Sequence, residues 1–253
     1  MPGAIREVYA LKIRFKFSKT GTLQYIGHLD VMRTFQKIHR RAGFDIAYSK
    51  GFSPHQLMSF ATPLGVGLTS VAEYVDVEFE SLSARDRDGC FHPLNGADEL
   101  IARFNEHSTP ELMLLDARIL PDDAKNAMSR LAAADYLVSF REGLAPVDLD
   151  EWFERFFAFY EDESIVTEKK TKTGKQEVDL KKQIRLLERR DNAVFMRVDT
   201  GSLSNLKPEL VMETFCRQEG LENARLLFDI ERTELYGEDE GVLKTLADDG
   251  KTF

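Results

Sequence analysis

Residues 11–43 read LKIRFKFSKTGTLQYIGHLDVMRTFQKIHRRAG, and this stretch decides the fold that we expect. Apolar and basic residues alternate over 11–17, which is the period of a half-buried strand. A helix is predicted over about Leu29–Ala42, and Gly43 follows it at the position where a left-handed residue commonly ends a helix. The stretch therefore predicts a strand that leads into a helix.

Beyond residue 43 the pattern continues to strands, a helix and a strand, and then the whole order repeats. In the first half we expect strands over Phe44–Ser49, Gln56–Leu64 and Val71–Glu80, a helix over Ala97–Glu106 and a strand over Leu112–Ile119. In the second half we expect a strand over Tyr136–Arg141, a helix over Asp148–Tyr160, two hairpins between Ile165 and Asp199, a helix from Pro208 to before Gly220 and a strand over Leu226–Leu235.

This order predicts an α+β fold made of two split-βαβ (ferredoxin-like) halves, with mainly antiparallel sheets and helices on one face. The polar, acidic stretch Pro121–Ala127 is the expected linker. We therefore expect an N-terminal domain at residues 1–121, a C-terminal domain at 128–236 and a mobile acidic tail at 237–253.

The composition is that of a globular chain. Of 253 residues, 43% are apolar and 30% charged, and no apolar run approaches the ~20 residues that cross a bilayer. The first residues lack the apolar core of a secretory signal, and two cysteines, Cys90 and Cys216, are too few for a disulfide framework or a Cys-rich metal site. These features predict a cytoplasmic protein that has no membrane partner.

Charge is segregated along the chain, although the net charge is −9. Residues 1–60 contain ten Lys and Arg against three Asp and Glu, whereas residues 61–120 contain four against eleven. Residues 167–190 return to nine against four. Because salt screens distant patches from one another, we expect two basic segments on an acidic body.

Four cations of the predicted helix recur at i, i+4, i+7 and i+8, which places them on one stripe: Arg33, Lys37, Arg40 and Arg41. A solvated outer helix face usually carries mixed charges, but no acidic residue lies between Val31 and Phe44. The stripe is therefore a candidate site for nucleic acid, with a plain solvated face as the alternative.

A second candidate nucleic-acid site straddles a predicted glycine turn and contains seven cations: Lys169, Lys170, Lys172, Lys175, Lys181, Lys182 and Arg185. Lysines on exposed hairpins often serve only to protect strand edges. Both interpretations stay open.

The first strand carries a third group of cations, on what we expect to be the open face of the sheet: Lys12, Arg14 and Lys16. The first and third strands are neighbours in a split-βαβ sheet, so acidic residues of the third strand can face this group: Asp76, Glu78 and Glu80. We favour cross-strand ion pairing as the role of these cations.

Two histidines lie near the basic N-terminal segment. His28 precedes the helix and His55 lies in a loop rich in turn residues, so the two could act as acid and base in RNA cleavage, with Lys19 or Lys50 stabilising the phosphate. The alternative is that both histidines only hydrogen-bond backbone and position loops. The sequence contains no GxxxxGKS/T or GxGxxG loop, no CxxC pair and no HExxH, so we predict no metal site.

Several motifs occur in an order that resembles one family. They read RFKFSKTG at Arg14–Gly21, YIGHLDVMR at Tyr25–Arg33, RRAG at Arg40–Gly43, YSKGFSPH at Tyr48–His55, SFATPL at Ser59–Leu64 and EYVD at Glu73–Asp76. Together they resemble the radical-SAM-linked domain of unknown function, which occurs beside a radical SAM protein or fused to its C-terminus. Gln56 departs from the proline that the family is expected to prefer at that position.

The resemblance implies an association with radical SAM chemistry. This sequence lacks the CxxxCxxC motif that holds the radical SAM cluster. The iron–sulfur cluster and S-adenosylmethionine are therefore expected in the partner, and no cofactor is expected in this chain. Within the motifs we expect a functional surface that contains seven residues: Tyr25, His28, Asp30, Gly51, Ser53, Pro54 and His55.

We therefore expect a non-catalytic accessory module of a radical SAM system that binds RNA, the radical SAM partner, or both. Two alternatives stay open. By analogy of fold alone with the RAMP proteins that process CRISPR RNA, the chain is a metal-independent endoribonuclease that uses His28 and His55. Otherwise it is a pure protein–protein adaptor that docks through the acidic residues of 61–120.

Overall fold

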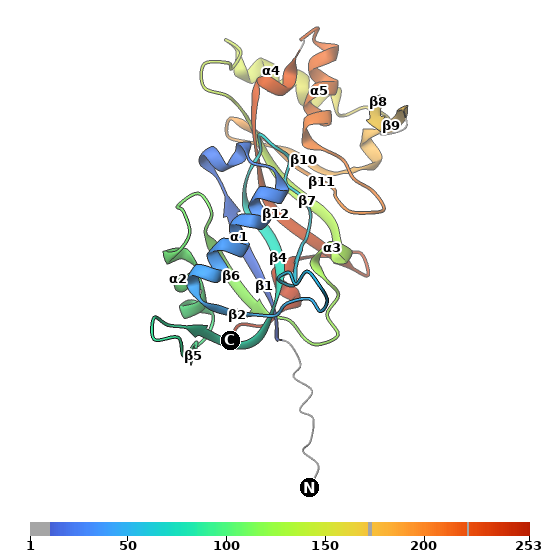
Figure 1. The fold of residues 1–253 in the computed structure, drawn as a ribbon. Coiled ribbons are helices and arrows are strands. Elements are labelled where there is room, and N and C mark those ends of the chain that lie inside the picture. The colour runs from blue at the N-terminus through green and yellow to red at the C-terminus, as the bar shows by residue number, and fades with distance from the viewer. Residues whose placement is uncertain (1–10, 172–173, 222) are drawn as a thin grey trace. The chain divides into compact units, whose positions relative to one another are not determined.

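The structure, a computed structural model, describes residues 11–171, 174–221 and 223–253 (Figure 1). The chain divides into two compact units. Unit 1 comprises the residues up to Val66, Ala72–Arg130 and Thr245–Phe253, and unit 2 comprises Gly67–Val71 and Leu131–Lys244. Each unit combines helices with a sheet of mostly antiparallel strands.

Unit 1 is built on a sheet with the strand order β6-β1-β4, and three short strands pair onto β4. Its strands are β1 (Leu11–Lys19), β2 (Phe44–Ile46), β3 (Met58–Phe60), β4 (Thr69–Arg85), β5 (Phe91–Pro93) and β6 (Leu114–Ile119). Its helices are α1 (His28–Ala42), α2 (Ala97–Glu106) and the short α3 (Ala127–Arg130), with 3-10 turns at Gly21–Tyr25 and Leu246–Asp249. β1 lies between β4 and β6, which is the strand order that a split-βαβ unit requires.

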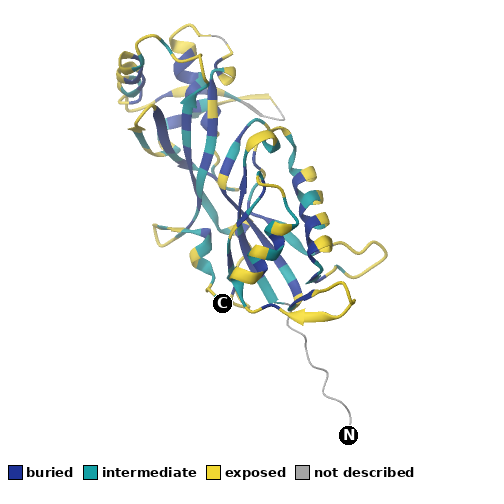
Figure 2. Cartoon of the chain, turned by 90° about the vertical axis from the view of Figure 1, so that its left-hand side faces the viewer, coloured by how far each residue is buried: buried dark blue, intermediate teal, exposed yellow. Residues whose placement is uncertain are grey.

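Aromatic side chains hold α1 and α2 on the same face of this sheet. The ring of Phe35 in α1 lies 4.8 Å from Phe17 of β1 and 5.2 Å from Phe104 of α2, measured between ring centroids. Residues on the inner side of α1 are buried and those on its outer side are exposed (Figure 2). α1 ends at Gly43, whose φ of 71° is left-handed and whose missing Cβ leaves room for the Arg85 carbonyl.

Unit 2 repeats this topology with other residues. Its main strands are β7 (Leu131–Phe140), β10 (Ile184–Arg190), β11 (Ala193–Asp199) and β12 (Phe228–Asp239), in the antiparallel order β10-β11-β7-β12. β13 (Val242–Thr245) pairs with β12, and β8 (Val166–Thr171) forms a separate hairpin with β9 (Gly174–Asp179). Its helices are α4 (Leu149–Phe159) and α5 (Pro208–Gln218), which pack together through Trp152 and Phe215, with ring centroids 5.3 Å apart.

The predicted α+β class is confirmed, and the strand order of each unit is the split-βαβ order. Several element bounds differ from those expected, among them β2 (Phe44–Ile46), β7 (Leu131–Phe140) and β12 (Phe228–Asp239), and two differences are the most marked. β4 extends to Arg85 because β2 and β5 pair with its second half. The strand expected over Gln56–Leu64 is reduced to β3, preceded by an isolated bridge between Gln56 and Tyr48.

A buried guanidinium joins four segments of unit 1. Arg14 of β1 is 1% exposed, and its Nε and Nη2 donate to the two carboxylate oxygens of Asp76 in β4 at 2.6 and 3.0 Å. Nη1 donates to the Asp249 carboxylate at 2.6 Å and to the Leu246 carbonyl at 2.8 Å, and Nη2 to the Lys125 carbonyl at 3.2 Å. Burial acts to lower the pKa of Arg14, but the hydrogen bonds and charges of the two carboxylates outweigh it and raise the pKa.

The predicted pairing of Arg14 with Asp76 is therefore present, but this face of the sheet is closed rather than open. The segment before α3 covers it, because the Ala127 amide donates to Asp76 at 2.9 Å. The C-terminal residues, which we expected to be a mobile tail, cover it as well. Asp249 pairs there with Arg130 at 3.1 Å as well as with Arg14, so two cations fix this acidic segment in unit 1.

A second buried polar group lies on the inner side of α1. His39 is fully buried, and its Nδ1 lies 2.9 Å from Oε1 of Gln56. An amide oxygen only accepts, so Nδ1 donates in this hydrogen bond and carries a proton. Burial lowers the pKa of His39 to about 4, although the hydrogen bond to Gln56 acts in the opposite direction.

Replacing Asp76 with Asn is expected to lower the free energy of unfolding by about 3–5 kcal/mol, because the charge of Arg14 then stays buried without a full counter-charge. Denaturant unfolding measures this loss. The matched control is Asp30→Asn, which removes an exposed ion pair with Arg33 and should leave the unfolding midpoint unchanged. Equal midpoints for the two variants would contradict the assigned role of the buried pair.

Stability is expected to fall as the pH drops from 6.5 toward about 4. Over this window the unfolded chain binds a proton at His39 and the folded chain does not. The contribution of His39 to the free energy of unfolding, about 3 kcal/mol, is therefore fully present only above pH 6.5. When the free energy of unfolding is measured at a series of pH values, it should fall less steeply with decreasing pH for His39→Phe than for the natural chain. An unchanged slope in His39→Phe would refute the assignment.

Candidate functional site

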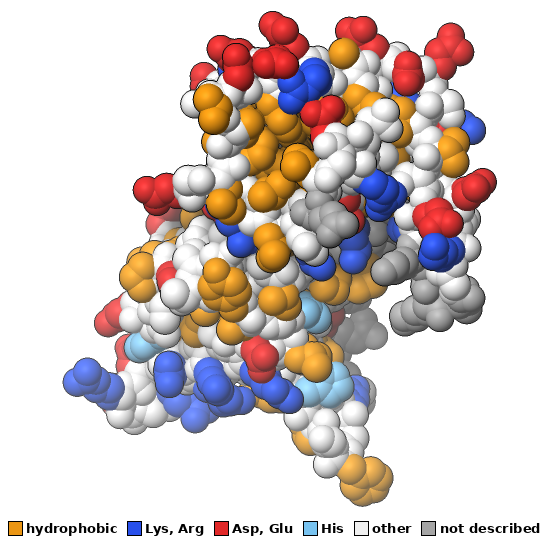
Figure 3. Space-filling model, turned by 90° about the horizontal axis from the view of Figure 1, so that it is seen from above, with side chains coloured by type: hydrophobic (Ala, Val, Ile, Leu, Met, Phe, Trp, Pro, Cys, Tyr) orange, Lys and Arg blue, Asp and Glu red, His pale blue; other side chains and the backbone are white. Residues whose placement is uncertain are grey.

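α1 has one buried side and one cationic side. The buried side faces the core of unit 1 and consists of Val31, Phe35, Ile38, His39 and Ala42. All four cations of the predicted stripe are exposed: Arg33, Lys37, Arg40 and Arg41. A row of Lys and Arg side chains accordingly follows the lower edge of the view in Figure 3, over α1. We call these four residues the cationic face of α1.

Most cations of this face have no acidic neighbour among the described residues. Within residues 11–171, 174–221 and 223–253, Arg33 alone of the four forms an ion pair, with Asp30 at 3.2 Å. The side chains of this pair are 65% and 58% exposed, so water screens their attraction. Lys37, Arg40 and Arg41 present their charges to solvent without a counter-charge in the described parts of the chain. Such a face can attract phosphates.

The segment 48–56, which we call the α1 loop, is fixed beside this face by one side chain. Gln56 is 4% exposed, and its Nε2 donates to the Tyr48 hydroxyl at 3.2 Å and to the Gln36 carbonyl at 3.4 Å. Its Oε1 accepts from His39. Gln36 neighbours Arg33 and Arg40 on the helix surface, because residues three and four apart share a face. Gln56 therefore places the α1 loop at the border of the cationic face.

The tip of the α1 loop is exposed and its base is closed by hydrogen bonds. Nδ1 of His55 lies 2.8 Å from the Ser49 hydroxyl, and the Ser49 amide donates to the His55 carbonyl at 2.8 Å. Five residues between them are exposed: Lys50, Gly51, Phe52, Ser53 and Pro54. Of these, Phe52 projects its whole side chain into solvent, and Tyr48 is 44% exposed. The loop thus adds aromatic rings and one further cation to the surface.

A small polar cavity lies at the other end of α1. Three ionisable side chains line it: Lys19 at the end of β1, Glu73 in β4 and His28 at the first position of α1. Lys19 and Glu73 are 2% and 4% exposed. His28 packs edge-on against Phe60, with ring centroids 5.0 Å apart, and burial lowers its pKa. The cavity has an accessible volume of about 10 Å³, which is room for roughly one water molecule.

The structure separates the two histidines of the cleavage hypothesis. Lys19 and His28 share the cavity, whereas the described residues that line it include neither His55 nor Lys50. Glu73 was not among the expected site residues, although it begins the motif EYVD at Glu73–Asp76. A base, an ammonium and a carboxylate in one cavity are suited to proton transfer, but the cavity is too small for a nucleotide.

The second basic segment is mostly neutralised within unit 2. Lys175 pairs with Glu168 at 2.6 Å, and Lys182 lies 3.7 Å from Asp179. Arg185 pairs with Asp199 and Glu238 at 2.6 and 2.8 Å, whereas Lys181 and Lys169 donate to backbone carbonyls of Tyr160 and Asn205. The side chain of Lys170, and Lys172 altogether, lie outside the described residues. This segment therefore offers less uncompensated charge than α1.

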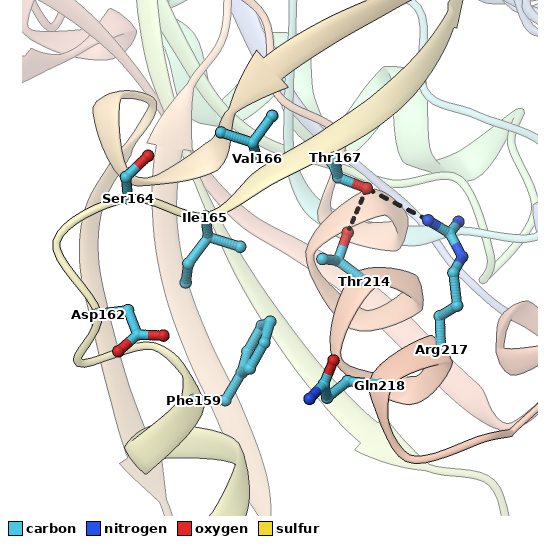
Figure 4. Close-up of a pocket in the computed structure, with 9 residues that line it drawn as sticks. All are labelled: Phe159, Asp162, Ser164, Ile165, Val166, Thr167, Thr214, Arg217 and Gln218. Carbon is cyan, nitrogen blue, oxygen red and sulfur yellow. Dashed lines mark hydrogen bonds between the residues drawn. The ribbon is translucent and has the colours of Figure 1, made fainter.

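A hollow that borders α5 in unit 2 is shown in Figure 4. It has a volume of about 340 Å³, with Phe159 and Ile165 on its apolar side. The Thr167 hydroxyl lies 3.3 Å from both Nη1 of Arg217 and the Thr214 hydroxyl (Figure 4). Its size suits a small ligand, but these polar groups already hydrogen-bond one another.

Metal ligands do not gather in the described parts of the chain, which contain no group of three His, Cys, Asp or Glu side chains arranged to hold an ion. Cys90 is exposed and Cys216 is buried, and both are free thiols. Every helix among the described residues is too short or too polar to cross a membrane.

Comparison with known protein families finds one match. The sequence profile of a family described as "Uncharacterized protein conserved in bacteria (DUF2344)" matches residues 12–208. The match runs from β1 to the first residue of α5, so it includes α1, the α1 loop and the small cavity. No curated protein matches the chain.

Replacing Gln56 with Ala is expected to free the α1 loop and to lower the free energy of unfolding by about 1–3 kcal/mol, because Nδ1 of His39 then lacks its partner. Hydrogen exchange measured by mass spectrometry should become faster at the amides of Ser49 and Leu57, which bond across the loop.

Gln24→Ala is the matched control, since it removes an exposed side-chain bond to Gly21 and should not change exchange in the α1 loop. Exchange that is equally slow in Gln56→Ala and in the natural chain would show that Gln56 does not hold the loop.

Proposed function

The chain belongs to this family of uncharacterised bacterial proteins, and we propose that it is a non-catalytic accessory module of a radical SAM system that binds RNA. In this proposal RNA contacts the cationic face of α1 and the α1 loop. The radical SAM partner supplies the iron–sulfur cluster and S-adenosylmethionine. The module acts in the cytoplasm, where cellular RNA is available.

The observation that supports RNA most strongly is the cationic face itself. Three exposed cations, Lys37, Arg40 and Arg41, lie on one helix face without an acidic neighbour in the described residues. A stripe of this kind attracts the closely spaced charges of a phosphate backbone, and binding releases counterions. The buried side of α1 holds the helix rigidly on the sheet, so the four charges keep a fixed spacing.

The radical SAM partner is supported by the motifs that resemble the radical-SAM-linked domain. They fall on the parts of unit 1 that carry the candidate site: the small cavity, the first turns of α1, and the α1 loop. The chain has two cysteines and no CxxxCxxC, so a cluster used by such a system belongs to the partner. Exposed motif residues that are not used for RNA are available to the partner, among them Asp30.

The second basic segment has a smaller part in the proposal. Its lysines Lys175 and Lys182 already face carboxylates, so a phosphate must compete with Glu168 and Asp179. We propose that the second basic segment makes only an auxiliary contact with RNA.

Cleavage of RNA is the second candidate function. The grouping of Lys19, His28 and Glu73 favours it, but their cavity would have to open before a nucleotide could enter. Prolonged incubation of RNA with excess protein in EDTA tests it. The accessory-module proposal predicts intact RNA, whereas cleavage with a bell-shaped pH profile that His28→Ala abolishes would establish the enzyme. A pure protein–protein adaptor would neither bind nor cleave RNA.

Fluorescence anisotropy of labelled bulk tRNA across a salt series tests the proposal. Three to four phosphate contacts predict that log affinity falls with log salt with a slope of about −2 to −4. Reversing all four residues of the cationic face to Glu should weaken binding at low salt at least about tenfold and flatten this slope.

The matched control reverses four exposed cations elsewhere, which gives the same change in net charge: Arg87, Arg155, Arg225 and Lys244. This variant should keep a slope close to that of the natural chain. Equal weakening by both variants would mean that only net charge matters, and no binding to the natural chain at low salt would refute RNA as the ligand.

A further inference from the structure

We infer that the RNA bound by this face is single-stranded, with unpaired bases stacked on the aromatic rings of the α1 loop. The inference rests on the proposed function and names its substrate class. It depends on where the exposed aromatic side chains lie relative to the cations, and not on the charges alone.

One aromatic ring of the α1 loop borders the cationic face, and a second lies at the tip of the loop. The Tyr48 hydroxyl accepts from Gln56, which also donates to the Gln36 carbonyl of α1 and so fixes the ring beside the helix. The Tyr48 side chain is nevertheless 44% exposed. Phe52, four residues farther along the loop, has no part of its side chain covered. Both rings therefore have faces open to solvent and available for stacking.

A third ring lies before the start of the helix. Tyr25 ends the 3-10 turn that precedes α1 and is 66% exposed, while neighbouring Leu23 and Ile26 pack against the core and hold the turn. α1 has 15 residues and is therefore about 22 Å long. The cationic face lies along this length, with Tyr25 near one end of the helix and the α1 loop beside its later turns.

Cations interleaved with exposed rings are the arrangement by which proteins bind single-stranded nucleic acid. The cations follow the backbone, and each ring stacks on a base of any identity. In a duplex the bases stack on one another and their faces are not available, so the rings would contribute little to duplex binding. Among the described residues Phe52 is fully exposed and adds no buried surface to unit 1, whereas a stacking platform requires this exposure.

The test compares two fluorescent RNA probes by anisotropy: an oligouridine of roughly twelve nucleotides and a blunt duplex of the same length. Phe52→Ala and Tyr48→Ala should each weaken binding of the oligouridine about tenfold and leave duplex binding unchanged. Their salt slopes should equal that of the natural chain, because stacking releases no counterions. Tyr48→Phe keeps the ring and loses only the hydroxyl that accepts from Gln56, so it should bind the oligouridine more tightly than Tyr48→Ala.

Leu203→Ala is the matched control, because Leu203 is an equally exposed apolar side chain in unit 2, and its binding should not change. Natural affinity of Phe52→Ala and Tyr48→Ala for the oligouridine would overturn the inference, and the proposed function would stand if reversal of the cationic face still abolished binding. Absence of salt-dependent binding to either probe would overturn both.

Discussion

Unit 1 depends on one charged group that is removed from water. The guanidinium of Arg14 bonds to β4, to the segment before α3 and to the C-terminal turn, and a buried charge of this kind is tolerated only when its partners are all in place. The pair with Asp76 also orients the neighbouring strands β1 and β4. Because side chains alternate along a strand, Lys19 and Glu73 then lie on the opposite, helix-covered face, where they line the cavity at the start of α1.

The local elements were predictable from the sequence because their causes are local. The alternation of residues 11–17 matches β1, and Gly43 ends α1 in the left-handed conformation that the sequence predicts. The i, i+4, i+7, i+8 spacing suffices to place four cations on one face, because the period of a helix brings residues at this spacing together: Arg33, Lys37, Arg40 and Arg41. The order of elements was enough to predict two split-βαβ halves, because that topology leaves few alternatives.

Contacts between distant residues were not predictable. Arg14 and Asp249 are separated by 235 positions, so nothing in the acidic C-terminal sequence indicates that it covers a buried cation. Gln56 reads as a departure from the family pattern, yet in the structure it connects His39, Tyr48 and the Gln36 carbonyl, a role that depends on how the α1 loop folds back on the helix. Likewise, two histidines near one basic segment do not share a site: His28 lines a cavity, and His55 closes a loop through Ser49.

The apolar side of α1 is held by the core of unit 1. We propose that its cationic side, together with the α1 loop, contacts RNA. Photo-crosslinking of RNA that contains 4-thiouridine, followed by mass spectrometry of the crosslinked peptides, tests this claim most directly. The account predicts crosslinks concentrated in residues 25–56, with Tyr48 and Phe52 among the modified positions. Crosslinks confined to unit 2, such as the β8–β9 hairpin, would contradict it.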